Sequence, residues 1–357
     1  MNVAVMGHGT VGRSVVRLLE NDPSICVKYI LEIPEKCTEE KMVSDPEIIF
    51  ADAGIETVVD ALPGVHPSFE LIQRALSSGK NVVTSNKAAL ANDFRALLDL
   101  TSENGPKIWC EATCGGTIPV IKEAASLSGT NEITHCYGIM NGTTNFILDV
   151  MKKEGREFTD VLLEAQRLGY AEADPTADIC GFDVKNKVIL LSSICYHGMV
   201  TKDFPVFGIE KISKEILDSL AAEGKTVKLL GISVRKENRY AIGVVPVIFD
   251  VSSLEANVPR NFNMFTLGCT NAGDVKLYGQ GAGGDPTADA VIRDLKDVQE
   301  GSGFGRSYFD CDLVYDPGLL KGEGIIDKEK VSGTLEELSG LACRKNAFFA
   351  FLPDFLK

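Results

Sequence analysis

The chain has 357 residues, of which 45% are apolar and 24% charged, and its formal net charge is -14 with a pI near 4.9. Two domains are expected, because this length exceeds what one hydrophobic core usually supports. The acidic balance argues against nucleic acid or an anionic membrane as the main partner, since the long-range field would repel both. No apolar run reaches the roughly 20 residues that span a bilayer, and no room is left for a signal peptide, so a cytoplasmic protein is expected.

Residues 2–6 form a short apolar run, GHGTVG follows at 7–12, and apolar residues at helical spacing come next. This order of strand, glycine-rich turn and helix is typical of a dinucleotide-binding fold. Gly7 would allow the tight turn, Gly9 would let a pyrophosphate approach the backbone, and Gly12 would let the helix pack closely on the strand. The pyrophosphate would then bind at the N-terminus of the helix.

A second apolar run, ICVKYIL at 25–31, predicts the next strand and is followed by Glu32. Glu32 lies twenty residues after Gly12, where an acidic side chain would accept hydrogen bonds from the ribose hydroxyls of a dinucleotide. The alternative interpretation is a glycine-rich turn that binds no ligand.

The alternation of strands and helices continues through the first third of the chain. Strands are expected at 57–62, 81–86 and 107–112, and helices at 67–78 and at about 87–103. Short strands rich in Val and Ile between helices predict a parallel sheet covered on both faces. Ligands of such sheets bind at the carboxyl ends of the strands, where Lys87 begins a helix. A solvated lysine is the alternative, but a positive charge is unfavourable at a helix N-terminus, which favours a ligand-binding role for Lys87.

The pattern then changes to a Gly-rich connection, a strand at 132–140 and longer apolar strands later in the chain. This change predicts an α+β domain with a mixed sheet. GQGAGGDPTADAV at 279–291 repeats the pattern of a glycine-rich turn that enters a helix. Its DPTAD segment also occurs at 174–178, and Asp174 and Asp285 are interpreted as helix caps.

Asp183 and Lys187 begin an apolar run with helical spacing, in which Lys187 shares a stripe with Leu190 and Ile194. The stripe places Lys187 toward the protein interior, where an unpaired ammonium is costly unless it loses its proton or gains a partner. Asp183, one turn earlier, would be that partner. An exposed pair that only supports the helix is the alternative. A desolvated lysine beside carboxylates is a candidate proton-transfer group for an alcohol that also carries an ammonium.

Six motifs occur in an order that a known family shares. They are GHGTVG, VVTSNKAAL, EATCGGTIP, GIMNGTTNFIL, LGYAEADPTADICGFDVKNK and GQGAGGDPTADAV, spread over about residues 2–298. The chain resembles the homoserine dehydrogenases, in the short form without an aspartokinase module or an appended regulatory domain. The resemblance implies reversible NAD(P)-dependent interconversion of L-homoserine and L-aspartate 4-semialdehyde in threonine, methionine and isoleucine biosynthesis. The implied fold is a Rossmann-type α/β domain with a parallel sheet plus an α+β substrate and dimerisation domain.

The resemblance also implies roles for individual residues. Lys187 would transfer the hydroxyl proton, Asp183 would be its partner, and Glu172 would bind the substrate's amino group. Asp174 and Asp178 would line the pocket. The implied cofactor-binding residues are Gly7, Gly9, Thr10, Val11 and Gly12 at the pyrophosphate, together with Lys87 and with Gly283, which would close over the cofactor. Lys87 would lie between nicotinamide and substrate and is also a candidate catalytic residue.

Members of this family also bind a sodium or potassium ion through the EATxGxxxP segment. The resemblance implies that Glu111 and the backbone carbonyls of Cys114, Gly116 and Ile118 would bind it. Oxygen ligands on a turn suit a hard cation and leave the Cys114 thiol uninvolved, and the ion would be structural, bracing the domain hinge. A zinc site is less favoured, because the ten cysteines are scattered and no nearby histidine completes four ligands with Cys110 and Cys114.

NAD is expected rather than NADP. Members that prefer NADPH tend to carry an arginine near the end of the second strand, whereas this chain has LEIPEK there. Glu32 would repel a 2'-phosphate, although Lys28 or Lys36 would be able to bind one. Besides the small-molecule substrate, the family resemblance implies a second copy of the chain as partner, in a homodimer through the mixed sheet.

The expected domains are a nucleotide-binding domain at 1–125 completed by 279–300, a substrate-binding and dimerisation domain at 126–278, and a C-terminal extension at 301–357. The extension is too short for a regulatory ACT module and lacks its βαββαβ order. Its NAFFAFLPDFL run is apolar enough to need a partner surface, as a lid or an oligomer contact would provide.

Two alternatives to homoserine dehydrogenase are considered. One is a reductase of another amino-acid-derived aldehyde or imine, which the same lysine and carboxylates would tolerate. The other is a dinucleotide-sensing Rossmann protein without catalysis, which would need no buried lysine. The position of Lys187 therefore discriminates between a catalytic and a sensing protein.

Overall fold

A computed structural model describes residues 1–357, and the chain divides into two compact units. Each unit combines segments that are far apart in the sequence. The first unit comprises Met1–Lys122, His197–Met199 and Ala282–Asp310, and the second comprises Glu123–Tyr196, Val200–Gly281 and Cys311–Lys357.

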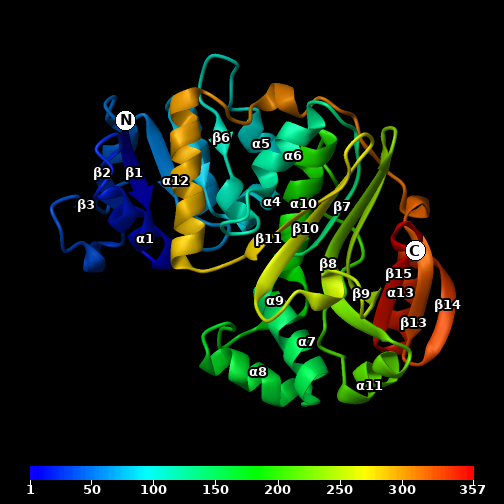
Figure 1. The fold of residues 1–357 in the computed structure, drawn as a ribbon. Helices are drawn as coiled ribbons and strands as arrows, with labels where there is room; N and C mark the ends of the chain where they lie inside the picture. Colours follow the sequence, from blue (N-terminus) through cyan, green and yellow to red (C-terminus); the bar gives the residue numbers. More distant parts are fainter. The chain divides into compact units, whose positions relative to one another are not determined.

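The first unit is built on a six-stranded parallel sheet with the order β3-β2-β1-β4-β5-β6 (Figure 1). Its strands are β1 (Asn2–Met6), β2 (Cys26–Leu31), β3 (Met42–Val43), β4 (Thr57–Asp60), β5 (Asn81–Thr84) and β6 (Ile108–Trp109). The strand order reverses between β1 and β4, as in doubly wound sheets that bind dinucleotides. The predicted Rossmann-type fold is therefore confirmed.

Helices connect these strands, and one of them departs from the prediction. The connecting helices are α1 (Thr10–Leu19), η1 (Pro34–Lys36), α2 (Glu47–Ala51), α3 (Ser68–Ser77), α4 (Lys87–Asn92) and α5 (Phe94–Leu98). After β6 come η2 (Glu111–Thr113), α6 (Val120–Ser128), of which only the first turn belongs to this unit, and later α12 (Gly284–Glu300) and η4 (Arg306–Tyr308). The single helix predicted at about 87–103 is wrong, because Asp93 interrupts it. Asp93 adopts φ -158° and its carboxylate accepts from Ala96 N, which caps α5. An aspartate that bonds the backbone in this way competes with helix continuation.

The core of the first unit lies between the sheet and the helices α1 and α12. Val3, Val5 and Val59 from the sheet pack with Val291 and Leu295 from α12, and all five are fully buried. Figure 1 shows α12 alongside α1 and β1, although most of the second unit lies between them in the sequence. The first unit is thus completed by a helix from late in the chain.

The second unit is built on a nine-stranded sheet with the order β11-β10-β7-β8-β9-β15-β13-β14, and β12 pairs with β9. Its strands are β7 (Ile133–Ile139), β8 (Lys225–Lys236), β9 (Arg239–Asp250), β10 (Phe262–Cys269), β11 (Gly273–Gln280), β12 (Val314–Tyr315), β13 (Lys321–Ile326), β14 (Glu329–Thr334) and β15 (Phe349–Pro353). β7 to β11 pair antiparallel, whereas β12 and β15 run parallel to β9. The predicted mixed sheet is confirmed.

Helices pack on both faces of this sheet, because Gly231 faces Val188 whereas Gly243, which pairs with the neighbouring Ile232, faces Leu335. They are α7 (Gly142–Glu154), α8 (Phe158–Arg167), α9 (Thr176–Ile179), α10 (Phe182–Tyr196), α11 (Lys214–Ala222), η3 (Glu255–Asn257), η5 (Pro317–Leu319), α13 (Leu335–Lys345) and η6 (Asp354–Leu356), and some of these belong to the C-terminal segment. α10 packs directly on β8, where a Cβ at Gly231 would lie 2.8 Å from Val188 Cβ and 3.0 Å from Met140 Sδ. None of the helices has the length and apolar character that crossing a membrane requires.

The C-terminal segment 311–357 extends the second unit's sheet with β12 to β15 and α13 (Figure 1). Phe349 and Phe351 of β15 are 1% and 0% exposed, in a core that they share with β7, β8 and β9. The Phe355 ring lies 5.9 Å from the Tyr137 ring of β7. The apolar run at the C-terminus thus finds its partner surface on the sheet of its own unit.

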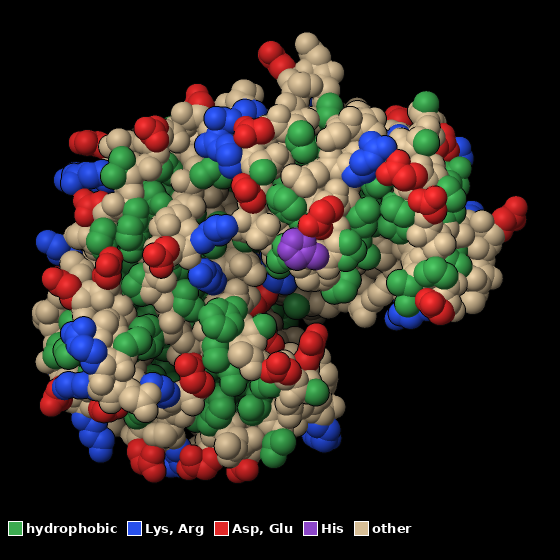
Figure 2. Space-filling view, turned by 180° about the vertical axis from the view of Figure 1, so that it is seen from behind, with side chains coloured by type: hydrophobic (Ala, Val, Ile, Leu, Met, Phe, Trp, Pro, Cys, Tyr) green, Lys and Arg blue, Asp and Glu red, His purple; other side chains and the backbone are tan.

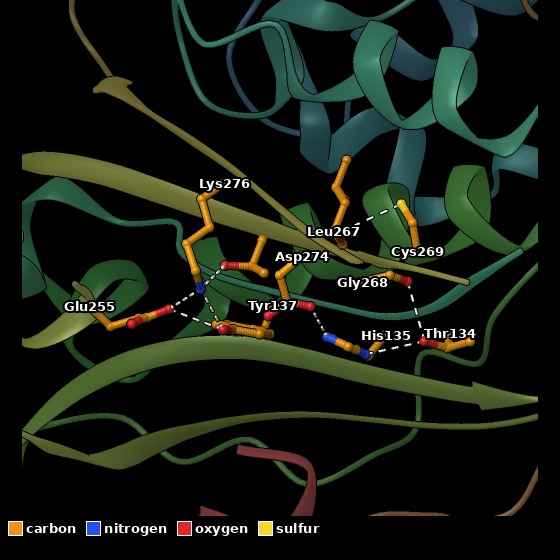
Figure 3. Close-up of polar contacts among 10 residues, drawn as sticks. Thr134, His135, Tyr137, Glu255, Leu267, Gly268, Cys269, Asp274 and Lys276 are labelled. Carbon is orange, nitrogen blue, oxygen red and sulfur yellow. Dashed lines mark hydrogen bonds and ion pairs between the residues drawn. The ribbon is translucent and has the colours of Figure 1, made fainter. Parts of the chain in front are cut away.

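A polar cluster joins β7 and β11 across β10 (Figure 3). Lys276 Nζ donates to Glu255 Oε1 at 2.5 Å and to Tyr137 OH at 3.0 Å, and Tyr137 OH donates to the same Glu255 oxygen at 3.0 Å. His135 Nε2 lies 3.1 Å from Asp274 Oδ1. These contacts attach the edge strand β11 to the rest of the sheet by side chains as well as by its ladder.

Candidate functional site

Lys187 and Asp183 form a buried ion pair on α10. Lys187 Nζ donates to Asp183 Oδ2 at 2.8 Å and to Met140 O at 2.7 Å, and the two side chains are only 9% and 12% exposed. The predicted inward orientation of Lys187 is confirmed, and the alternative of an exposed helix pair is wrong. Burying two charged side chains costs desolvation free energy. The short hydrogen bonds of Lys187 to Asp183 and Met140 O offset that cost.

Asn141 connects this pair to a second carboxylate. Its Nδ2 donates to Asp183 Oδ2 at 2.9 Å and to Asp178 Oδ1 at 2.7 Å, and its Oδ1 accepts from Thr144 N at 2.8 Å, which caps α7. Burial, followed by the neighbouring Asp183, raises the pKa of Asp178. The sequence reasoning missed Asn141, although an Asn before Gly-Thr-Thr at a helix start is a capping signal.

Glu172 and Asp174 lie on the exposed segment between α8 and α9. The Asp174 carboxylate accepts from Thr176 Oγ1 at 2.6 Å and from Thr176 N at 3.1 Å, and these bonds lower its pKa. The structure thus brings Asp178, Asp183 and Lys187 together, whereas Asp174 is engaged with its own turn and the Glu172 side chain is exposed.

The glycine-rich turn has the geometry that its spacing predicts. Gly7 adopts φ +95°, and a Cβ at Gly12 would lie 2.0 Å from Gly7 O, so helix α1 reaches the strand only without a side chain there. Nothing lies within 4 Å of a Cβ built at Gly9. Gly9 precedes Thr10 and Val11 at the start of α1, where no side chain caps the first amides. Such a helix start is suited to a phosphate.

The second glycine-rich turn lies against the first within the same unit. Gly283, with φ +125°, is the N-cap of α12, and a Cβ at Gly284 would lie 3.0 Å from Thr10 Cγ2. Asp285 Oδ1 accepts from Ser14 Oγ at 2.7 Å and from Arg17 at 2.5 Å. The interpretation of Asp285 as a helix cap is therefore wrong, because Gly283 takes that position and Asp285 pairs with α1.

Glu32 and Lys87 both follow carboxyl ends of strands in the first unit. Glu32 comes directly after β2, and its Oε2 accepts from His8 N of the glycine-rich turn at 3.3 Å. Lys87 is the first residue of α4 and is half-buried, and Asn86 caps that helix by accepting from Ala89 N at 3.1 Å. The unit thus gathers both predicted cofactor residues at the sheet edge that carries the glycine-rich turn.

Glu111 is a buried carboxylate at the start of α6. Its oxygens accept from Ile121 N at 3.0 Å and Lys122 N at 2.7 Å, and its own amide donates to Asp294 Oδ2 at 2.9 Å. Burial raises the pKa of Glu111 to about 7 and, with Glu111 beside it, raises that of Asp294 well above its usual range. Glu111 therefore has a structural role, because its carboxylate binds the first amides of α6.

The carbonyls predicted to bind a cation follow Glu111 on a turn in which Gly115 and Gly116 adopt φ +80° and +56°. Ile118 O accepts from Val120 N at 2.8 Å. No group of three or more His, Cys, Asp and Glu side chains is placed to hold a metal ion. Carboxylate and carbonyl oxygens are the ligand type that a hard cation prefers, whereas zinc sites are usually built from thiolate and imidazole ligands.

Charges are dispersed on the surface. On the face seen in Figure 2, Lys and Arg side chains form small groups between Asp and Glu side chains. On this face the two signs of charge are intermixed, so local donors such as helix amides are better suited to an anionic ligand than a broad basic surface.

Comparisons with known proteins agree on one family. Residues 119–295 match the sequence model for homoserine dehydrogenase, and residues 7–111 match that for the homoserine dehydrogenase NAD binding domain. The homoserine dehydrogenase of Corynebacterium glutamicum is 36% identical over 316 residues, covering 83% of this chain and 71% of that protein. That of Neisseria gonorrhoeae is 30% identical over 376 residues, covering 97% and 86%. The crystal structure of a homoserine dehydrogenase from Thiobacillus denitrificans matches with a TM-score of 0.88 at 28% identity, covering 99% of this chain and 98% of that chain.

Proposed function

This chain belongs to the homoserine dehydrogenase family and interconverts L-homoserine and L-aspartate 4-semialdehyde with a nicotinamide dinucleotide, and we propose that Lys187 transfers the hydroxyl proton in that reaction. The observation that carries this proposal is the buried Nζ of Lys187, held 2.8 Å from Asp183 Oδ2. Lys187 belongs to one of the six motifs that this chain shares with the family. Its amine is buried on α10 and lies next to carboxylates.

Oxidation of the alcohol needs a base for the hydroxyl proton. The bound dinucleotide supplies the hydride acceptor in this direction and the hydride donor in the other. Lys187 accepts the proton from the hydroxyl in this direction and returns a proton to the carbonyl oxygen in the reverse direction. Asp183 holds the amine in place through their 2.8 Å contact.

The substrate's ammonium group needs anionic partners. Asp178 lies within reach of the same Asn141 amide that binds Asp183, which keeps two carboxylates close to Lys187. We assign Glu172 to the ammonium and Asp174 and Asp178 to the pocket wall, following the motif. The exposure of Glu172 and Asp174 leaves their carboxylates accessible to a ligand.

For the cofactor, we assign the pyrophosphate to the amides of Gly9 and the first residues of α1. Gly7 and Gly12 shape the turn, Gly283 covers it from α12, and Lys87 lies beside the nicotinamide. Glu32 at the end of β2 favours NAD, because its carboxylate accepts ribose hydroxyl hydrogens and repels a 2'-phosphate. A sodium or potassium ion bound by Glu111 and the carbonyls of Cys114, Gly116 and Ile118 would neutralise a buried carboxylate that otherwise has only amide partners.

We assign cofactor binding to residues 1–125 with 279–300 and substrate binding to 126–278, and within the extension 301–357 the segment 311–357 enlarges the second unit's sheet. A cytoplasmic homodimer is proposed, with the contact through the part of the mixed sheet near β11. Its support is the Tyr278 side chain, which is 53% exposed and stacks on Phe262 with ring centroids 5.2 Å apart. Light scattering on the purified protein measures the subunit number directly.

The proton-transfer proposal is tested by absorbance at 340 nm with L-homoserine and either NAD or NADP, at neutral and alkaline pH. Lys187→Ala should lose about 10²- to 10⁴-fold in kcat while it still binds cofactor. Lys185→Ala is the matched control, because Lys185 lies on the same helix but packs over the Phe204 ring at 5.5 Å. Loss of kcat in both variants, or in neither, would contradict the assignment, and no absorbance with either cofactor would contradict the activity.

A further inference from the structure

Asp60 is a buried carboxylate without a cationic partner. It ends β4, is 0% exposed and pairs with Thr84 across the sheet. Its Oδ2 accepts from Ser68 Oγ at 2.8 Å and from Thr84 Oγ1 at 2.8 Å, and its Oδ1 accepts from Leu62 N at 3.3 Å. Burial raises the pKa of Asp60 to about 6, although all three donors lower it. A carboxylate kept here at such a cost has a role beyond filling space.

The bonds of Asp60 continue into a closed ring. Thr84 Oγ1 donates to Asp60 and accepts from Asn86 N at 2.9 Å. Asn86 Nδ2 then donates to Leu62 O at 3.0 Å and to Gly64 O at 2.6 Å. Leu62 N also donates to Asp60, which closes the ring. The loop after β4 is therefore connected to the loop after β5 twice, through Asp60 and Thr84 and through Leu62 and Asn86.

The ring adjoins both halves of the dinucleotide site. Ala61, next to Asp60, approaches the glycine-rich turn, since a Cβ at Gly7 would lie 3.0 Å from Ala61 O. On the other side, Asn86 Oδ1 caps α4, whose first residue is Lys87. A movement of the ring would therefore displace the pyrophosphate turn and the start of the Lys87 helix relative to each other.

We propose that Asp60 and Thr84 are positioning residues that hold the glycine-rich turn and Lys87 in register for the dinucleotide. The inference rests on the proposed cofactor role of Lys87 and of the glycine-rich turn. Neither residue touches the reacting atoms, and both act through the backbone of the two loops. The effect is therefore on cofactor affinity, and the hydroxyl proton transfer at Lys187 is untouched.

Thr84→Val tests the ring because valine keeps the shape of threonine and removes the hydroxyl. It leaves Asn86 N without its acceptor and Asp60 with one donor fewer. Affinity for NADH, measured by fluorescence titration without homoserine, should fall about tenfold, the effect of about one hydrogen bond. Thr84→Ser retains the hydroxyl and should bind NADH within about twofold of the unmodified chain.

Ser68→Ala is a matched control for stability. Ser68 donates to the same Asp60 oxygen over the same 2.8 Å but has no bond to Asn86. Ser68→Ala should lower the melting temperature about as much as Thr84→Val and leave NADH affinity unchanged. Asp60→Asn should weaken NADH binding, and combining it with Thr84→Val should give less than the sum of the two effects.

Equal loss of NADH affinity in Ser68→Ala and Thr84→Val would overturn the proposal, because it would show a general loosening of the unit. Unchanged affinity in Thr84→Val, or full additivity with Asp60→Asn, would also overturn it. These titrations do not involve turnover. Absence of homoserine oxidation would therefore contradict the activity, and equal kcat in Lys187→Ala and Lys185→Ala would contradict the proton transfer, without affecting this result.

Discussion

Replacing Asn141 with serine removes the amide that joins two carboxylates and leaves α7 capped. Asn141 Nδ2 contacts Asp178 at 2.7 Å and Asp183 at 2.9 Å, whereas its Oδ1 holds Thr144 N. Serine caps a helix about as well as asparagine, so the change isolates the two contacts to carboxylates. At about 1.5 kcal/mol or more for each hydrogen bond to a charged group, the free energy of unfolding should fall by about 3 kcal/mol.

The same substitution should change the pH dependence of the reaction. The bond from Asn141 lowers the pKa of Asp178, against burial and Asp183, which raise it. Without that bond the pKa of Asp178 rises further, so a higher pH is needed before its carboxylate is ionised and adds negative charge near the substrate's ammonium. The acidic limb of kcat/KM for homoserine should therefore move to higher pH in Asn141→Ser.

Urea unfolding and a pH profile of kcat/KM measure these two effects. Asn141→Ala is the companion variant, because it also loses the cap and should be less stable than Asn141→Ser by about 1 kcal/mol. An Asn141→Ser protein with an unchanged urea midpoint and an unchanged acidic limb would refute the reasoning, since it would show that the amide does not stabilise the carboxylates.

Two further predictions concern each unit separately. Gly12→Ala should lower the melting temperature, because the added Cβ would lie 2.0 Å from Gly7 O. Gly9→Ala should keep the normal melting temperature, because nothing lies within 4 Å of its Cβ. It should nevertheless bind NADH more weakly in a fluorescence titration. Burial lowers the pKa of Lys228 from 10.5 to about 7. Between pH 10.5 and about 7, Lys228 is protonated in the unfolded chain but neutral in the folded chain. The free energy of unfolding should therefore fall by about 1.4 kcal/mol for each pH unit that the pH is lowered, and Lys228→Met should lack this pH dependence. Urea unfolding of both proteins from pH 7 to 10 measures this, and parallel curves would contradict the buried neutral amine.

Local patterns were sufficient to predict the glycine-rich turn and the orientation of Lys187. Gly12 is needed because of its contact with Gly7 in the same turn, Gly7 adopts a positive φ in that turn, and the stripe of Lys187 with Leu190 and Ile194 is a property of one helix. These features depend on spacing within about a dozen residues. They therefore follow from the sequence without knowledge of the rest of the fold.

Contacts between distant segments were not predictable in the same way. The interruption between helices α4 and α5 at Asp93 depends on whether the Asp93 carboxylate accepts from Ala96 N or faces water. The spacing of apolar residues does not decide between these two arrangements. The bond of Asn141 to Asp178 and Asp183 joins three elements and becomes visible only when they are packed. The pairing of β15 with β9, through Phe351 and Val247, likewise depends on the fold of the whole unit.

The late return of α12 has a consequence for how the chain is made. Ala288, Val291 and Leu295 fill the core of the first unit and are fully buried beside β1 and α1. During synthesis, the amino-terminal sheet leaves the ribosome long before these residues exist, so its hydrophobic surface stays uncovered while the second unit is being translated. The nascent amino-terminal segment Met1–Lys122 must therefore be protected by a chaperone or persist as an incomplete fold until translation has passed α12.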